Sequence, residues 1–162
     1  MRLLLMMICG VCFSLTAQAK SHTGLPDGAV GVLTVPQMTQ GELLWLKGRV
    51  GTGKYITVDS SGRHCSIEVP VAVGGFMSSG IGLDSVDGLT IVVTSSSLND
   101  AIVEGERINS EAWKFARSPA FAGGTVDAYI LSGLSADEGF IINSKRRWLS
   151  WLSDSTPKSL CL

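Results

Sequence analysis

The chain has 162 residues, of which 45% are hydrophobic and 17% charged, with a formal net charge of −1 at pH 7. This length suits one domain of ordinary size, and the absence of a basic stripe argues against a nucleic-acid partner. Nineteen glycines, together with many β-branched residues, are typical of short strands joined by tight turns.

Residues 1–19 have the pattern of an export signal. Arg2 supplies a positive charge, an almost unbroken apolar run follows over Leu3–Leu15, and Ala17-Gln18-Ala19 offers the small residues that signal peptidase reads. Because the apolar run is too short to cross a bilayer stably, we expect a mature chain without a transmembrane segment. We expect it to pass through the periplasm to the cell surface or the medium.

The mature chain begins with a polar stretch, residues 20–28, which we expect to be a flexible tail with a turn at Pro26-Asp27-Gly28. Removing 19 of the 162 residues leaves 143, and we expect residues 29–162 to form a single domain. Its first strand is predicted over Ala29–Val35, where side chains alternate before Pro36 ends the run.

A meander of three short strands is predicted next. The strands are Glu42–Val50, Lys54–Asp59 and Arg63–Val69, and their apolar and polar residues alternate. Two glycine-containing turns, Gly51-Thr52-Gly53 and Ser60-Ser61-Gly62, would join them.

In the second half of the chain, the boundaries between predicted elements are less clearly marked. Pro70–Gly88 contains several Gly and Ser residues and is predicted as loops, whereas Leu89–Thr94 is nearly continuous in apolar residues and indicates burial on both faces. A turn is predicted over Ser95–Asp100, and strands are predicted over Ala101–Ile108, Thr125–Leu131 and Gly139–Ile142. The apolar residues have helical spacing over Asn109–Phe115 and Lys145–Leu152, although a strand fits Lys145–Leu152 nearly as well. These elements predict an all-β fold, an antiparallel sandwich or small barrel with one or two short helices.

Cleavage of the signal would leave two cysteines, Cys65 and Cys161. Because the expected destination is oxidising, a single disulfide is the favoured interpretation. The alternative is two free thiols, one of them a nucleophile beside His64. Adjacent strand residues point to opposite faces, however, so His64 and Cys65 are not positioned to share a proton.

Signals for catalysis are weak, and we expect no enzyme, metal or cofactor. Gly48–Lys54 has the spacing of a phosphate loop, but Tyr55 stands where Ser or Thr would hold magnesium, so a hairpin turn is the better interpretation. No clustered metal-ligand set is found. A hydrolase would have to use carboxylates such as Glu104 with Glu106, or Asp84, which we interpret as solvated surface.

The most concentrated chemistry lies near the C-terminus, where cations precede tryptophans. Such a group could bind an anionic glycan, a lipid surface or a receptor; the simpler interpretation places the tryptophans in the core and the cations at its rim. The candidate surface consists of Lys145, Arg146, Arg147, Trp148 and Trp151.

The N-terminal strand suggests a different use, because an alternating segment behind a flexible tail suits strand addition to a neighbouring sheet. The candidate donor residues are Ala29, Val30, Gly31, Val32, Leu33, Thr34 and Val35. Pairing within the chain's own sheet is an equally good interpretation.

In its export signal, mature length, Gly/Ser/Thr/Val-rich composition, single expected disulfide and alternating N-terminal segment, the chain resembles minor subunits of bacterial chaperone–usher fimbriae. The resemblance implies an immunoglobulin-like sandwich, with other fimbrial subunits and a periplasmic chaperone as partners. The leading hypothesis is thus a structural subunit that polymerises by strand exchange. The alternative is a secreted module that binds a host glycan or receptor.

Overall fold

The computed structural model describes residues 25–118, 126–135, 138–144 and 159–161, and for residues 43–45 and 76–84 it describes the backbone alone. Most of the described chain is in strands, so the expected all-β architecture is confirmed, with a curled sheet and one short helix among these residues. The elements are β1 (Gly31–Val58), β2 (His64–Val93), α1 (Ser96–Val103), β3 (Ile108–Asn109), β4 (Phe115–Ala116), β5 (Ala128–Ser132), β6 (Gly139–Ile142) and β7 (Leu160–Cys161).

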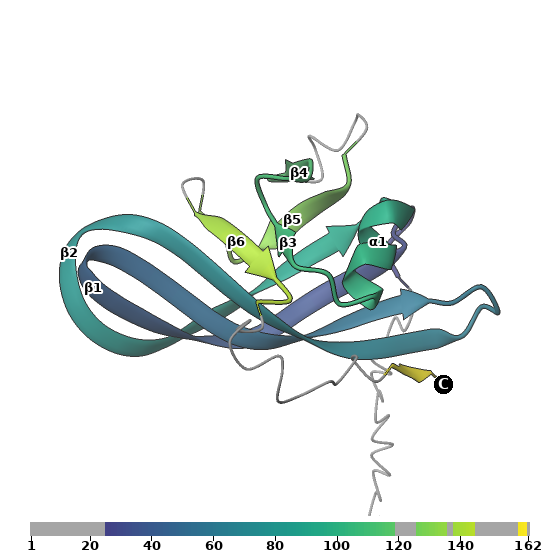
Figure 1. The fold of residues 1–162 in the computed structure, drawn as a ribbon, viewed down its shortest axis with the longest axis horizontal. Coiled ribbons are helices and arrows are strands. Elements are labelled where there is room, and N and C mark those ends of the chain that lie inside the picture. The colour runs from purple at the N-terminus through teal and green to yellow at the C-terminus, as the bar shows by residue number, and fades with distance from the viewer. Residues whose placement is uncertain (1–24, 119–125, 136–137, 145–158, 162) are drawn as a thin grey trace, which may run out of the picture.

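Two very long strands dominate the fold. β1 and β2 pair antiparallel from Gly31 opposite Val93 to Val58 opposite His64, with a register shift between Leu44 and Leu46. The resulting hairpin curls back on itself (Figure 1). The predicted strands Lys54–Asp59 and Arg63–Val69 of the meander are confirmed within β1 and β2. The predicted turn before Lys54 and the loops over residues 70–88 are wrong, because the chain stays extended and paired through both regions.

Glycines allow the two halves of the curled hairpin to approach closely. A Cβ on Gly51 would lie 2.8 Å from Val35 Cγ1 and 2.9 Å from the carbonyl oxygen of Gln37, and a Cβ on Gly53 would lie 2.8 Å from Leu33 Cδ1. Real Cβ atoms do not tolerate such distances, so these positions need glycine. The predicted Gly51-Thr52-Gly53 turn is wrong: these residues are the contact between the hairpin's halves.

The turn at the end of the hairpin is the one predicted over residues 60–62. The backbone N–H of Asp59 donates to the carbonyl of Arg63 (3.0 Å), and Gly62 adopts a φ of 79°. The earlier turn at Pro26–Gly28 is also confirmed, with Ala29 N–H donating to the Pro26 carbonyl at 2.9 Å.

The short strands extend each half of the hairpin separately. β5 pairs with β2 near Ile91, and β4 adds to β5 in parallel, whereas β6 pairs with β2 near Val73, and β3 adds to β6. β3 and β4, at the ends of the strand order β3-β6-β2-β5-β4, have two residues each. β1 has 28 residues and pairs with β2 alone among the described strands.

The core lies between the two halves of the hairpin. Leu89, Ile91, Val92 and Val93 are all at most 1% exposed, which confirms burial on both faces of the predicted strand Leu89–Thr94. The predicted strand Gly139–Ile142 is β6 with the same bounds.

A helix closes one end of the core, in a region where sequence patterns predicted a turn and a strand. Ser95 accepts a hydrogen bond from Leu98 N–H as N-cap of α1, and Leu98 and Ile102 are fully buried. Asn109, expected to begin a helix, lies in β3. Its side chain accepts from Glu111 N–H instead, so it stabilises a turn, as Asn often does.

A candidate ligand pocket

The candidate donor segment completes its own sheet in this structure. Gly31–Val35 pairs with β2, and the side chains of Leu33 and Val35 are 0% and 2% exposed in the core. Of the two interpretations of this segment, pairing within the chain is the one observed.

The other residues singled out from the sequence do not converge on one site. Cys65 and Cys161 form the expected disulfide, which ties β7 to β2. Gly48–Lys54 lies inside β1 without a following helix, so it is not a phosphate loop. Glu104 ends α1, and Glu106 follows the left-handed Gly105, so these exposed carboxylates do not share a strand face.

Two further candidates fall partly or wholly outside the description. The cationic and aromatic surface Lys145–Trp151 lies outside the described residues. For Asp84 the backbone alone is described, within β2 rather than on a loop.

A pocket that no sequence pattern predicted lies where a connecting segment crosses between the two halves of the sheet. We call Ser110–Ala116 the bridge segment. At one end, Ser110 Oγ accepts from Phe140 N–H and Ser110 N–H donates to the Phe140 carbonyl, both at 3.0 Å. At the other end, Lys114 N–H donates to Asp127 Oδ2 at 2.9 Å. The bridge segment is therefore attached to both β6 and the start of β5 (Figure 1).

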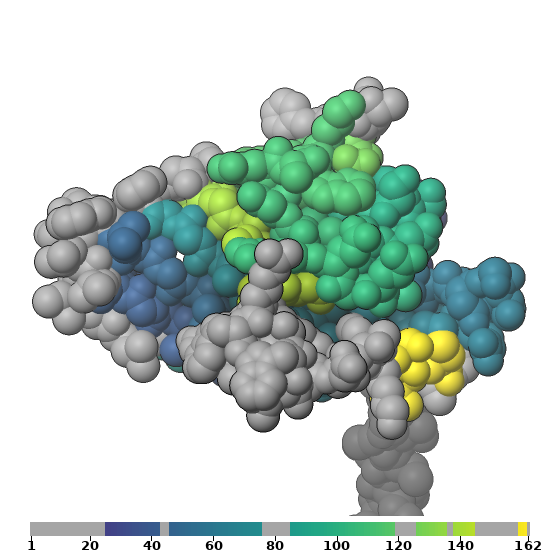
Figure 2. All heavy atoms as spheres, viewed as in Figure 1, coloured from purple at the N-terminus to yellow at the C-terminus, as the bar shows by residue number. Residues whose placement is uncertain are grey.

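The volume of the pocket is about 380 Å³, within the range of small-ligand sites. Residues 96–118 form a continuous surface over the hairpin (Figure 2), and the bridge segment within them supplies half of the lining. The lining residues are Ser110, Glu111, Trp113, Lys114, Phe115, Arg117, Ile130, Glu138, Gly139 and Phe140.

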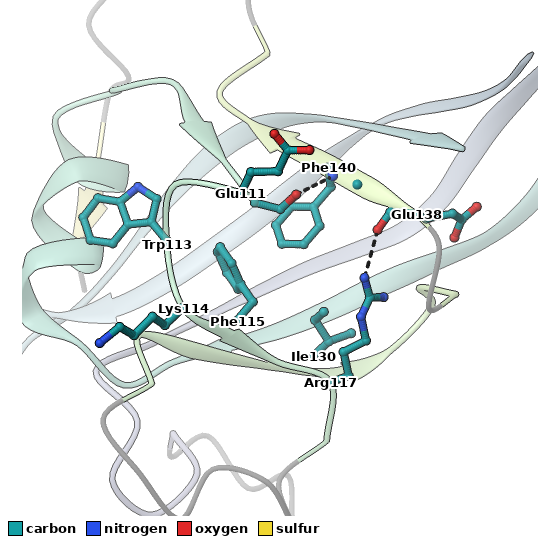
Figure 3. Close-up of a pocket in the computed structure, with 10 residues that line it drawn as sticks. Glu111, Trp113, Lys114, Phe115, Arg117, Ile130, Glu138 and Phe140 are labelled. Atoms are coloured by element: carbon teal, nitrogen blue, oxygen red, sulfur yellow. Dashed lines mark hydrogen bonds between the residues drawn. The ribbon is translucent and has the colours of Figure 1, made fainter. Parts of the chain in front are cut away.

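One side of the pocket is aromatic. Phe115 and Phe140 meet edge to face, with ring centroids 4.7 Å apart and an interplanar angle of 75°, a favourable geometry for two aromatic rings. Phe140 and Ile130 are buried, whereas Phe115 and Trp113 are half-buried and pack against the core. Phe115 therefore keeps part of its ring surface accessible (Figure 3).

The pocket also has polar lining residues. Glu111 and Arg117 are exposed, and the guanidinium of Arg117 donates to the backbone carbonyls of Ser135 and Glu138. These bonds hold the residues that precede β6 against the end of β4 (Figure 3).

A buried ion pair supports the same wall from the inside. Arg49, on β1, donates to Glu138 Oε2 at 2.5 Å and to the Gly133 carbonyl at 3.0 Å, and Ser135 N–H donates to Glu138 Oε2 at 2.9 Å. The side chains of Arg49 and Glu138 are 10% and 7% exposed. The Nε–H of Arg49 has no partner among the described residues, and both of these hydrogen bonds come from the same terminal nitrogen, Nη2.

The pocket residues were missed because they share no local spacing. Trp113, Phe115 and Arg117 alternate, as on one face of a strand, but such a triplet is common in core strands. Ile130 and Glu138 come from other elements, and sequence separation gives no indication that they lie nearby.

None of the helices in the described part of the chain is long and apolar enough to cross a bilayer. In comparisons with known proteins, the chain matches no family model, no curated protein and no solved structure.

Proposed function

We propose that this chain is a self-contained exported binding module, and that the pocket beside the bridge segment holds a small polar ligand with an apolar face, such as a saccharide unit. The observation that carries the proposal is the combination of accessible aromatic rings at Phe115 and Trp113 with hydrogen-bonding groups at Glu111 and Arg117. Sugars present just these two kinds of surface: C–H groups that pack on rings, and hydroxyls that need donors and acceptors. Ligand sites in general combine an apolar lining with a few placed polar groups.

The packing of the sheet also favours a self-contained module. The N-terminal strand fills its own core with Leu33 and Val35, and the close contact at Gly51 and Gly53 packs the other half of β1 against it. A function based on strand addition needs an open edge or a strand that can leave. Binding at a pocket needs neither.

The test is a titration of the purified protein against a panel of neutral and acidic oligosaccharides by isothermal calorimetry. We expect saturable binding to at least one of them. Glu111→Gln should weaken it about 10-fold, since a hydrogen bond to a charged group contributes about 1.5–3 kcal/mol. Glu104→Gln is the matched control, because it also removes an exposed carboxylate, at the end of α1 and outside the pocket lining.

Two results would count against the proposal. One is the absence of binding across the whole panel. The other is equal binding by the Glu111→Gln and Glu104→Gln proteins, which would place the ligand elsewhere.

Strand exchange in a fimbria, by a subunit with an immunoglobulin-like sandwich, is a second hypothesis. It is favoured by the position of Gly31–Val35 at the N-terminal end of β1, which pairs with β2 alone among the described strands. It requires Leu33 and Val35 to leave the core. Expression of the chain alone in a periplasm distinguishes the two: instability rescued by a peptide spanning residues 28–37 supports exchange, and a stable monomer supports the binding module.

A further inference from the structure

We propose that the ligand of this pocket carries a carboxylate that Arg117 binds, so that acidic sugars bind more tightly than their neutral counterparts. This inference rests on the proposed function and names the class of saccharide. It depends on Arg117 and the charged groups around it, not on the aromatic side of the pocket. Glu111, an exposed carboxylate of the lining, lies beside Phe140 and not beside Arg117 (Figure 3).

The guanidinium of Arg117 is oriented by backbone carbonyls, and no carboxylate of the described residues forms an ion pair with it. Its two terminal nitrogens donate to the carbonyl oxygens of Ser135 and Glu138, the latter at 3.3 Å. Both acceptors are uncharged, and an arginine has five N–H donors in all. The side chain is therefore held at the pocket wall with positive charge and donors left for a ligand.

The carboxylate closest in sequence to these contacts is already occupied. Glu138 directs its side chain away from Arg117 (Figure 3) and pairs with Arg49 at 2.5 Å on the buried side. Among the described residues, the ion pairs are Arg49 with Glu138 and Arg63 with Asp59. Neither pair includes Arg117, so no described carboxylate neutralises it.

A ligand carboxylate supplies what this position lacks. The guanidinium fork binds a carboxylate through two parallel hydrogen bonds, and charge-assisted bonds of this kind are stronger than those to neutral hydroxyls. Lys114 also lines the pocket, but its side chain points away from Arg117 and Glu138 (Figure 3). Arg117 is thus the cation placed to determine specificity.

The experiment compares matched sugars that differ only in charge: oligogalacturonates and the same oligosaccharides after methyl esterification, and sialyllactose against lactose. We expect at least one acid to bind about 10-fold or more tightly than its neutral partner. The preference should shrink as salt is raised, because salt screens exposed charges. Equal affinities for acid and neutral forms would overturn this inference and leave the proposed function standing, whereas binding of neither form, here and across the wider panel, would overturn both.

Two variants assign the preference to one residue. Arg117→Gln should abolish the acid preference while neutral sugars still bind, and Arg107→Gln, which removes the same charge from an exposed residue outside the pocket lining, should leave the preference intact. Loss of the preference in Arg107→Gln to the same extent would overturn the assignment to Arg117, because it would show an effect of net charge alone. A urea titration of each variant checks that the fold is retained, and the acid-to-neutral ratio of the unaltered protein tests the inference even if Arg117→Gln unfolds.

Discussion

Replacing Arg49 by Met tests whether the buried ion pair supports the pocket wall. The substitution would leave the Glu138 carboxylate, 7% exposed, with Ser135 N–H as its remaining hydrogen-bond donor among the described residues. It would also remove the donor to the Gly133 carbonyl. Breaking a buried ion pair by removing one partner costs about 3–5 kcal/mol, because the remaining charge is buried without compensation.

This loss is large compared with the total stability of a domain, which is about 5–15 kcal/mol. With a urea m-value of about 2 kcal/mol per molar, the midpoint of unfolding should fall by about 2 M. The double variant Arg49→Met with Glu138→Gln should recover part of the loss, since Gln is neutral and its carbonyl can still accept from Ser135 N–H. A double-mutant cycle then gives the coupling between the two side chains.

The control is Arg63→Met, which removes an arginine from an exposed ion pair, where the Arg63 side chain is 60% exposed. Exposed ion pairs contribute little to stability, so this midpoint should barely move. If Arg49→Met shifted the midpoint no more than Arg63→Met, or if the double variant were no more stable than Arg49→Met, the buried pair would not have the role assigned to it.

Three further predictions concern the fold. Reduction of the Cys65–Cys161 bond, whose cysteines are 96 residues apart, should lower stability by about 4–5 kcal/mol in the chain-entropy treatment, and an unchanged urea midpoint in dithiothreitol would contradict this. Gly53→Ala should cost about 1–3 kcal/mol through overpacking, whereas Gly74→Ala, where a Cβ meets nothing within 4 Å, should cost less; equal losses would refute the close contact. Burial, with a smaller effect of Asp100, raises the pKa of Tyr55 well above its ordinary value. The stabilisation of the folded state that comes from this shift is therefore complete below about pH 10 and is lost as pH rises from there through the raised pKa. The loss of unfolding free energy caused by Tyr55→Phe should therefore be smaller at about pH 11 than at about pH 8 in urea titrations, and an identical loss at the two pH values would contradict the shift.

Local patterns predicted those parts of the fold that depend on local physics. Continuous apolar residues identified the buried strand at Leu89–Val93, the short strand predicted over Gly139–Ile142 is β6, and the expected loss of the signal cysteines pointed to the Cys65–Cys161 bond. Each of these outcomes follows from residues that are adjacent in sequence or from a simple count.

The main errors came from glycine and asparagine, whose local signals are ambiguous. Glycine serves both at turns and at close backbone contacts, and only the curled tertiary structure distinguishes Gly62, which is in a turn, from Gly53, which faces Leu33. Similarly, Asn109 can begin a helix or stabilise a turn, and its place beside β6 decided between them. The pocket could not be predicted either, because Glu111, which follows β3, and Glu138, which precedes β6, are far apart in sequence and are brought near each other by the pairing of β3 with β6.

The shape of the hairpin has a consequence for the order in which the chain folds. Pairing can begin at the Asp59–Arg63 turn, where partners are few residues apart, and extend outward along both strands, so that each new pair closes only a small additional loop. The pairs between Leu89–Val93 and the segment that starts at Gly31 would then form last. We expect amide protons near Gly31 to exchange by opening from that end sooner than those near Ile67, so the first residues to detach during partial unfolding would be those at the chain's N-terminal edge.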